Sequence, residues 1–193
     1  ILITGANGQL GHEMRNALKG NNRFEYIFTD VAELDICNAE AVKQIIADNH
    51  IDYIVNCAAY TQVDKAEDNA ELCKKINTDA VENLARAAAD YGARMIHIST
   101  DYVFNGRGYS PYTEDMPPDP QSVYGSTKLE GEKILTDICP ESIIIRTAWL
   151  YSPYGNNFVK TMLHLGEERE ELSVVADQIG TPTCAADLAQ AIL

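Results

Sequence analysis

The chain lacks the features that mark several special classes of protein. No apolar run approaches the roughly 20 residues of a membrane span, and no basic stretch with an apolar run precedes the first predicted strand. The five cysteines are odd in number and scattered, so neither a disulfide scaffold nor a cysteine zinc site is predicted. Positive charge is scarce: 15 Lys and Arg face 29 Asp and Glu, for a net charge of −14. Nucleic acid and membranes are therefore not expected as partners, and the cysteine usage favours a reducing, cytoplasmic compartment.

What is present is ordinary for a globular protein. The 193 residues are 46% hydrophobic, with 12 Gly and 7 Pro, and they exceed one typical domain in length. We expect a dinucleotide-binding Rossmann domain in residues 1–150 and part of a smaller substrate-binding region, interleaved with it, in residues 151–193. Because residues 187–193 form a helical pattern with no stop signal, we expect a fragment that lacks its C-terminal part.

Short β-branched runs alternate with longer segments of helical period along most of the chain. This alternation predicts an α/β fold with a doubly wound parallel sheet, whose ligands lie at the carboxyl ends of the strands. The strands are predicted at residues 1–4, 24–29, 51–57, 94–99, 142–147 and 172–176, and the fifth is expected to be buried because it holds three successive Ile. Helices are predicted at residues 10–19, 39–48, 70–91, 124–137, after 157 and from 187 onward. Residues 101–121 are rich in Gly and Pro and are predicted to be a long, functional loop.

A glycine recurs at every third position directly after the first strand, in Gly5-Ala-Asn7-Gly8-Gln9-Leu10-Gly11. Such glycines allow a tight turn and a close approach of the backbone to a pyrophosphate, and the helix that follows offers free N–H groups to the anion. The run therefore predicts a dinucleotide site, with a structural glycine turn as the alternative.

Asp30 ends the second strand, 19 positions past Gly11, where a carboxylate accepts hydrogen bonds from the adenosine ribose. A carboxylate repels a 2′-phosphate, so NADH is favoured, and NADPH stays open because Lys19 and Arg23 are near in sequence. Further cofactor contacts are predicted at Asp35 and Ile36 beside the adenine, at Ala58, Ala59 and Tyr60 after the third strand, and at Asn77, for which a solvated helix position is the alternative.

Tyr124 and Lys128 are four residues apart on a predicted helix and thus share one face. A nearby ammonium stabilises a phenolate, and at an effective dielectric constant of 20 it could lower the tyrosine pKa by up to about 3 units. Ser99 and Thr100 end the fourth strand and face the same crevice. We predict Thr100, Tyr124 and Lys128 as catalytic residues, with Ser99, Tyr124 and Lys128 also contacting the cofactor.

The glycine run, then Ser-Thr, then Tyr-x-x-x-Lys, in this order, resembles the extended short-chain dehydrogenase/reductase family over essentially the whole chain. Residues 57–67, 99–106, 146–151 and 177–182 further resemble the members that act on dTDP-linked 4-keto sugars. The resemblance implies NAD(P)H-dependent reduction of the 4-keto group of dTDP-4-dehydro-L-rhamnose to dTDP-L-rhamnose, a precursor of cell-surface polysaccharide. It also implies that Thr100 and Tyr124 contact the reacting oxygen and that Lys128 holds the nicotinamide ribose. Sugar contacts are expected at Thr61, Val63, Asp64, Thr100, Asp101, Tyr102 and Trp149, with core packing as the alternative for Tyr102 and Trp149.

Rival functions stay open at this point: an epimerase or dehydratase that acts on another nucleotide sugar, or a regulatory subunit without catalysis. Sister dehydratases carry Asp-Glu after the Thr, whereas this chain has Asp101-Tyr102, which disfavours elimination. A non-catalytic regulatory subunit similar to that of methionine adenosyltransferase would bind dinucleotide without needing Thr100, Tyr124 and Lys128. No catalytic metal is predicted. Mg²⁺ at an oligomer contact stays open, because Glu13 matches one ligand position in similar reductases, with a solvated first-turn Glu as the alternative. A homodimer also stays open.

Overall fold

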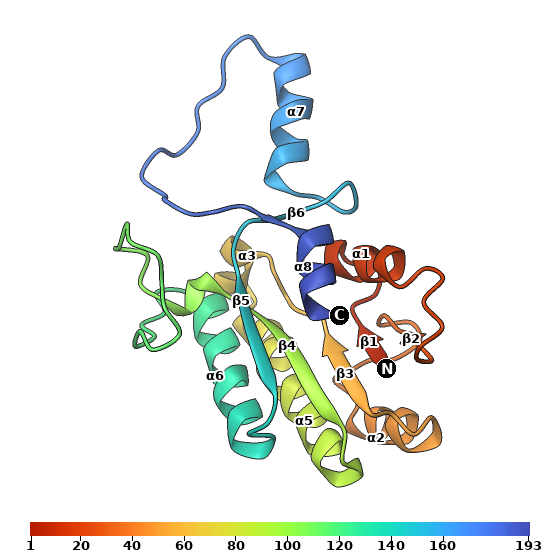
Figure 1. Ribbon diagram of the computed structural model, residues 1–193. Coiled ribbons are helices and arrows are strands. Elements are labelled where there is room, and N and C mark those ends of the chain that lie inside the picture. The colour runs from red at the N-terminus through yellow and green to blue at the C-terminus, as the bar shows by residue number, and fades with distance from the viewer.

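The computed structural model describes residues 1–193 and is built around a parallel five-stranded sheet in the order β2-β1-β3-β4-β5 (Figure 1). Its strands are β1 (Leu2–Thr4), β2 (Ile27–Phe28), β3 (Tyr53–Asn56), β4 (Arg94–Thr100) and β5 (Ile143–Thr147). The strand order reverses between β1 and β3, which is where doubly wound sheets bind their ligands. The predicted fold class is confirmed, although the second strand is shorter than the expected residues 24–29.

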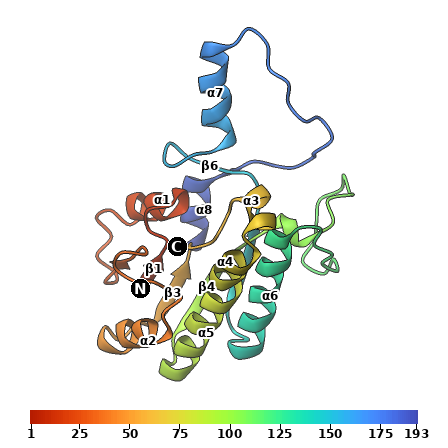
Figure 2. The same ribbon diagram turned by 180° about the vertical axis from the view of Figure 1, so that it is seen from behind.

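Helices cover both faces of the sheet. Figures 1 and 2 show α1 (Gln9–Ala17) and α8 (Ala185–Ile192) on one face, and α2 (Ala39–Asp48), α5 (Ala80–Tyr91) and α6 (Val123–Ile138) on the other. Successive strand residues point to opposite faces. Leu2 and Ile54 are thus buried against α2 and α5, whereas Ile3 and Val55 are buried against α1 and α8. Each such side chain contributes about 1.5–3 kcal/mol by leaving water, so the alternation holds both helical layers on the sheet.

The helix expected at residues 70–91 is interrupted at one place. It consists of α4 (Ala70–Lys74), a π-helical turn over Lys75–Asp79 and α5, and it ends at Gly92, whose φ is +72°. Single π turns occur often at functional sites because the extra residue redirects side chains. Here the turn contains Asn77, one of the predicted cofactor residues.

Smaller elements complete the chain. They are α3 (Val63–Asp68), a 3-10 turn over Asp101–Val103, β6 (Leu150–Tyr151), α7 (Phe158–Glu168) and β7 (Thr183–Cys184), with β6 and β7 forming a separate parallel pair. Apart from that turn, residues 101–121 contain no helix or strand, as predicted for the loop. The strand predicted at residues 172–176 is wrong, because that segment is exposed and pairs with no other strand. None of the helices combines the length and apolar character that crossing a membrane requires.

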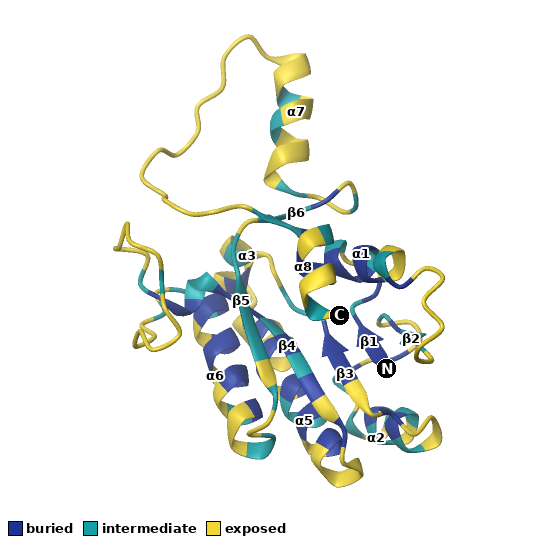
Figure 3. Ribbon diagram, in the orientation of Figure 1, coloured by how far each residue is buried: buried dark blue, intermediate teal, exposed yellow.

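The prediction of a buried fifth strand is also wrong. β5 is the edge of the sheet and pairs only with β4, so its other edge is open. Ile143 is 57% exposed, and the rest of β5 is only partly buried (Figure 3). α7 likewise has no buried residue and stands away from the sheet (Figures 1 and 3). A run of Ile indicates that a strand is stabilised by burial, but it does not show which helix or strand covers it.

Candidate active site

The glycine run makes a tight turn between β1 and α1. Gly5 has φ +63°, and a Cβ atom there would lie 2.6 Å from the backbone nitrogen of Ala58, on the adjacent β3 side. A Cβ atom on Gly11 would lie 2.5 Å from the carbonyl oxygen of Gly5. Both positions therefore require glycine for close backbone packing. Gly8 caps α1, whose first-turn N–H groups are available to an anion at the switch point of the sheet.

Asp30 lies against this turn, as expected for a ribose-binding carboxylate. Its Oδ2 accepts a hydrogen bond of 2.9 Å from the backbone N–H of Asn7, and its Oδ1 accepts one of 2.8 Å from Val31. The carboxylate is thus fixed beside the glycine turn. A phosphate group placed directly against this carboxylate would be repelled by its negative charge.

Other predicted cofactor residues differ in what they can offer a ligand. The side chains of Leu10 and Ile36 are buried in the two cores, so only their backbone groups could contact a nucleotide, whereas Asp35 is exposed. The Gln9 side chain is occupied: its Nε2 donates to the Leu150 carbonyl at 3.3 Å, and its Oε1 accepts from Asn157 at 2.9 Å. Gln9 therefore joins the glycine turn to the segment that follows β5.

Asn77 clamps the backbone of Tyr60. Its Oδ1 accepts from the Tyr60 N–H at 2.8 Å, and its Nδ2 donates to the Tyr60 carbonyl at 3.1 Å. Asn77 is 1% exposed, so the alternative of a solvated helix residue is wrong. The π turn brings this amide inward and so fixes the course of residues 58–60 beside the glycine turn.

Thr100 and Tyr124 come together at the carboxyl end of β4. Thr100 is 4% exposed and Tyr124 is 8% exposed, and Tyr102 packs edge-on against Tyr124 with ring centroids 5.5 Å apart. The Thr100 hydroxyl donates to Asp101 Oδ1 at 3.2 Å and accepts from the Tyr102 N–H at 3.2 Å. A Cβ atom on Gly125 would collide with the carbonyl oxygen of Tyr102, so this glycine lets α6 begin directly against the 3-10 turn.

The expected lowering of the Tyr124 pKa is not found. Burial raises the pKa of Tyr124 to about 12, and the charges of Asp101 and neighbouring groups act in the same direction, while a hydrogen bond with Thr100 opposes them. Burial likewise lowers the pKa of Lys128 to about 8. Desolvation outweighs attraction here, because a buried ammonium is itself disfavoured. At neutral pH the phenol of Tyr124 therefore carries its proton.

Lys128 lies fully inside the fold, 1% exposed, beneath the end of β4. Its Nζ donates to the carbonyl oxygen of Ile98 at 2.7 Å and lies 3.3 Å from Nε2 of His97. Ser99 follows Ile98 in β4, and its Oγ is buried without a hydrogen-bond partner. An unpaired buried hydroxyl is uncommon, and this one fits a ligand hydroxyl at the carboxyl edge of the sheet.

The predicted sugar contacts differ in burial and in the residues that they contact. Burial raises the pKa of the Tyr102 phenol, and the charges of Asp101 and Asp64 raise it further. Because Asp64 belongs to α3, this helix and the 3-10 turn face each other. Val63 packs in the same small cluster as Tyr124, whereas Thr61 is exposed. Trp149 is 43% exposed, so the packed alternative is wrong. Its backbone has φ +46°, an unfavourable value for a residue with a Cβ, and its indole covers Gly180.

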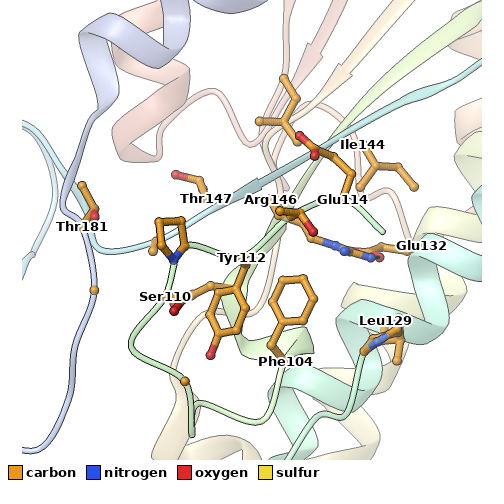
Figure 4. A pocket seen from close by; sticks show the side chains of 18 of the residues that line it. Phe104, Ser110, Tyr112, Glu114, Leu129, Glu132, Ile144, Arg146, Thr147 and Thr181 are labelled. Carbon is orange, nitrogen blue, oxygen red and sulfur yellow. Dashed lines mark hydrogen bonds and ion pairs between the residues drawn. The ribbon is translucent and has the colours of Figure 1, made fainter. Parts of the chain in front are cut away.

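A cavity of about 1090 Å³ lies beside this group, between α6, β5 and the long loop (Figure 4). The guanidinium of Arg146 makes two hydrogen bonds to Glu132, at 3.0 and 2.6 Å, and lies over the ring of Phe104, which stacks on Tyr112. Of the predicted site residues, Asp101 alone lines this cavity. Arg146 and Glu132 were not predicted as a pair, since nothing in their sequence spacing shows that β5 brings them together.

The residue considered for magnesium, Glu13, is 7% exposed and accepts a hydrogen bond from Asn16 at 3.2 Å. It lies in the second turn of α1 rather than the first, so the alternative of a solvated first-turn residue is wrong. No group of three or more His, Cys, Asp or Glu side chains is arranged to hold a metal ion.

Comparison with known proteins places these observations in a family. The family model described as the RmlD substrate binding domain matches residues 1–193. The chain belongs to this family. It is 46% identical over 193 residues to the dTDP-4-dehydrorhamnose reductase of Aggregatibacter actinomycetemcomitans, covering 100% of this chain and 66% of that relative.

Solved structures agree with this assignment. A dTDP-4-dehydrorhamnose reductase from Clostridium acetobutylicum superposes with a TM-score of 0.96 at 52% identity, over 99% of this chain and 68% of the other. One from Bacillus anthracis, solved in complex with NADP, gives a TM-score of 0.95 at 46% identity, over 99% and 68%. The resemblance to reductases of this kind is confirmed, and the chain spans slightly less than two thirds of the length of the first curated relatives.

Proposed function

We propose that the protein containing this chain reduces the 4-keto group of dTDP-4-dehydro-L-rhamnose to give dTDP-L-rhamnose, in the cytoplasm. The observation that carries the proposal is the buried Thr100–Tyr124 hydroxyl pair above Lys128, at the same sheet edge as the glycine turn. The names of the relatives support the substrate. Residues 1–150 act as the dinucleotide-binding part, and residues 151–193 begin the region that contacts the sugar.

A nicotinamide nucleotide fits the residues present. Gly5, Gly8 and Gly11 admit its pyrophosphate, Asp30 accepts from its adenosine ribose, and Ser99 and Lys128 face its nicotinamide half. Asp35, the backbone of Ile36 and residues 58–60, held by Asn77, complete the contacts. When bound, this group supplies a hydride to the ketone carbon.

The proton comes from Tyr124. Because the phenol is protonated at neutral pH, it can act as the acid that neutralises the oxygen as negative charge develops there. The Thr100 hydroxyl turns from Asp101 and donates to the same oxygen. The other residues that contact the sugar in this proposal are Thr61, Val63, Asp64, Asp101, Tyr102 and Trp149.

This arrangement favours reduction over a regulatory subunit and over a dehydratase. A regulatory dinucleotide-binding subunit has no need for an acid buried beside Thr100. A dehydratase needs a second carboxylate where this chain has Tyr102, whose ring is packed against Tyr124.

The Tyr124→Phe variant tests the acid. It keeps the ring that packs against Tyr102 but removes the hydroxyl, so we expect kcat to fall by about 10²- to 10⁴-fold, with NADH affinity nearly unchanged in a fluorescence titration. Turnover is followed by loss of NADH absorbance with the dTDP-4-keto sugar. Tyr112→Phe is the matched control, because that ring stacks on Phe104 in the neighbouring cavity. Full turnover in Tyr124→Phe refutes the assignment.

We also propose that NADH binds more tightly than NADPH, because Asp30 is held against the glycine turn where a 2′-phosphate would lie. The relative from Bacillus anthracis was solved in complex with NADP, so the test compares the affinities for both cofactors. Dissociation constants for both cofactors should favour NADH in the natural protein, and the difference should shrink in Asp30→Asn. Tighter binding of NADPH by the natural protein would overturn this preference.

A further inference from the structure

A chain of buried polar side chains crosses the sheet beneath the proposed active site. It runs from Thr4 of β1 through Asn56 of β3 and His97 of β4 to Lys128 of α6. Asn56 and His97 are 0% exposed, and Thr4 and Lys128 are each 1% exposed. Water cannot rearrange these hydrogen bonds, so each partner has to supply the correct donor or acceptor.

The donor and acceptor roles along these side chains can be assigned from a backbone N–H group, because such a group can only donate. The N–H of Ala58 donates to Asn56 Oδ1 at 3.1 Å, and the hydroxyl of Thr4 donates to the same oxygen at 2.7 Å. This fixes the orientation of the Asn56 amide. Its Nδ2 therefore faces Nδ1 of His97, 3.0 Å away, and must donate to it.

Nδ1 of His97 is then an acceptor without a proton, so the proton of the neutral ring is on Nε2. Burial lowers the pKa of His97 well below its usual value, and a positive charge on Lys128 lowers it further, so the ring is neutral with Lys128 in either form. Nε2 lies 3.3 Å from Nζ of Lys128. An ammonium has no lone pair to accept this N–H, whereas an uncharged amine does.

We propose that His97, held in its Nε2–H form by Asn56, is a positioning residue that opposes protonation of Lys128 and orients its amine. The uncharged amine accepts from His97, donates one N–H to the Ile98 carbonyl and keeps its second N–H for a ligand. The other groups near Nζ favour the ammonium: Glu132 on the next turn of α6 and Cys73 on α4. Tyr124, one turn earlier, is neutral. Burial of Nζ disfavours the ammonium as well, so His97 acts together with burial and against Glu132 and Cys73 in setting the charge of Lys128.

The part that Lys128 plays in turnover rests on the proposed function, but the inference itself concerns the protein without cofactor or substrate. Full-length protein carrying ¹³Cε-labelled lysine reports the charge of Lys128 by NMR across a pH titration, and Lys128→Met identifies the resonance. We expect a midpoint at or below about 8 in the natural protein. A loss of reductase activity with this midpoint retained would count against the function and not against His97.

His97→Gln is the informative variant, because its amide reaches the place of Nε2 and can turn its oxygen toward Nζ. We expect the midpoint to rise by at least one pH unit, a tenfold gain in proton affinity. His97→Asn is the matched control: its amide can still accept from Asn56 but does not reach Lys128, so a smaller rise is expected. Equal midpoints in all three proteins would overturn the proposal, since a purely structural His97 would change stability without moving this titration.

A second measurement needs no variant and covers the case in which the substitutions prevent folding. The ¹⁵N shifts of the His97 ring, read through their couplings to the ring protons, show which nitrogen carries the proton. A bare Nδ1 and a protonated Nε2 support the proposal. The opposite tautomer, or a doubly protonated ring at pH 7, overturns it.

Discussion

Replacing Asn77 by Ala tests whether the π turn exists to hold the backbone of residue 60. The variant leaves the N–H and the C=O of Tyr60 without partners, and each unpaired buried group costs about 1–3 kcal/mol. Tyr60 is only partly buried, so water recovers some of this loss and we expect about 2–3 kcal/mol in all. At a urea dependence of about 2 kcal/mol per molar, the unfolding midpoint should fall by about 1 M or more.

Asn83→Ala is the matched control on the same helix. Asn83 makes one such hydrogen bond, from its Nδ2 to the carbonyl of Ile36 at 3.1 Å, so its loss should cost about 0.5–1.5 kcal/mol. Asn77→Asp keeps the acceptor for the Tyr60 N–H and should lie between Asn77→Ala and the natural protein. NADH affinity should also fall in Asn77→Ala, because residues 58–60 lie beside the glycine turn. If Asn77→Ala unfolds at the same urea concentration as Asn83→Ala, the clamp has no special role.

Two further predictions follow from the packing and the buried lysine. Gly11→Ala should weaken NADH binding at least tenfold in a fluorescence titration, because its Cβ would lie 2.5 Å from the carbonyl oxygen of Gly5. Gly108→Ala is the control and should bind NADH normally, because its Cβ would have no atom within 4 Å. Equal NADH affinities of the two variants would contradict the argument. Burial lowers the folded-state pKa of Lys128 to about 8 from 10.5, so the unfolded chain binds more protons between these values and stability should rise with pH from about 8, by up to about 1 kcal/mol per pH unit. Above pH 9 the raised pKa of Cys57 opposes this rise in stability, so urea unfolding is compared at pH 8 and 9. The free energy of unfolding of Lys128→Met should change less between these two pH values than that of the natural protein. An equal change in both proteins would refute the assignment.

Most of the sheet could be predicted from the sequence because its evidence is local. Hydrophobic period located β1, β3, β4 and their covering helices to within about two residues, and the glycine spacing located the turn that Gly5 and Gly11 make possible. What the sequence could not show depends on neighbours. The exposure of Ile143 follows from β5 being the edge of the sheet, and Asn77, in the π turn, makes hydrogen bonds to Tyr60, 17 positions away in the sequence.

The same distinction separates the two levels at which the active site could be predicted. The i, i+4 spacing correctly indicated that Tyr124 and Lys128 share a helix face, but it could not give the sign of the pKa shift, because that sign depends on depth. Both groups are buried, so desolvation favours the neutral phenol and the neutral amine together. The sequence did hold a signal for the buried polar side chains that lead to Lys128, because each is a polar residue in an apolar strand. His97 stands between Ile96 and Ile98, and Asn56 follows Val55. A polar side chain buried in an apolar strand needs a hydrogen-bond partner. For His97 that partner, beyond Asn56, is Lys128 itself.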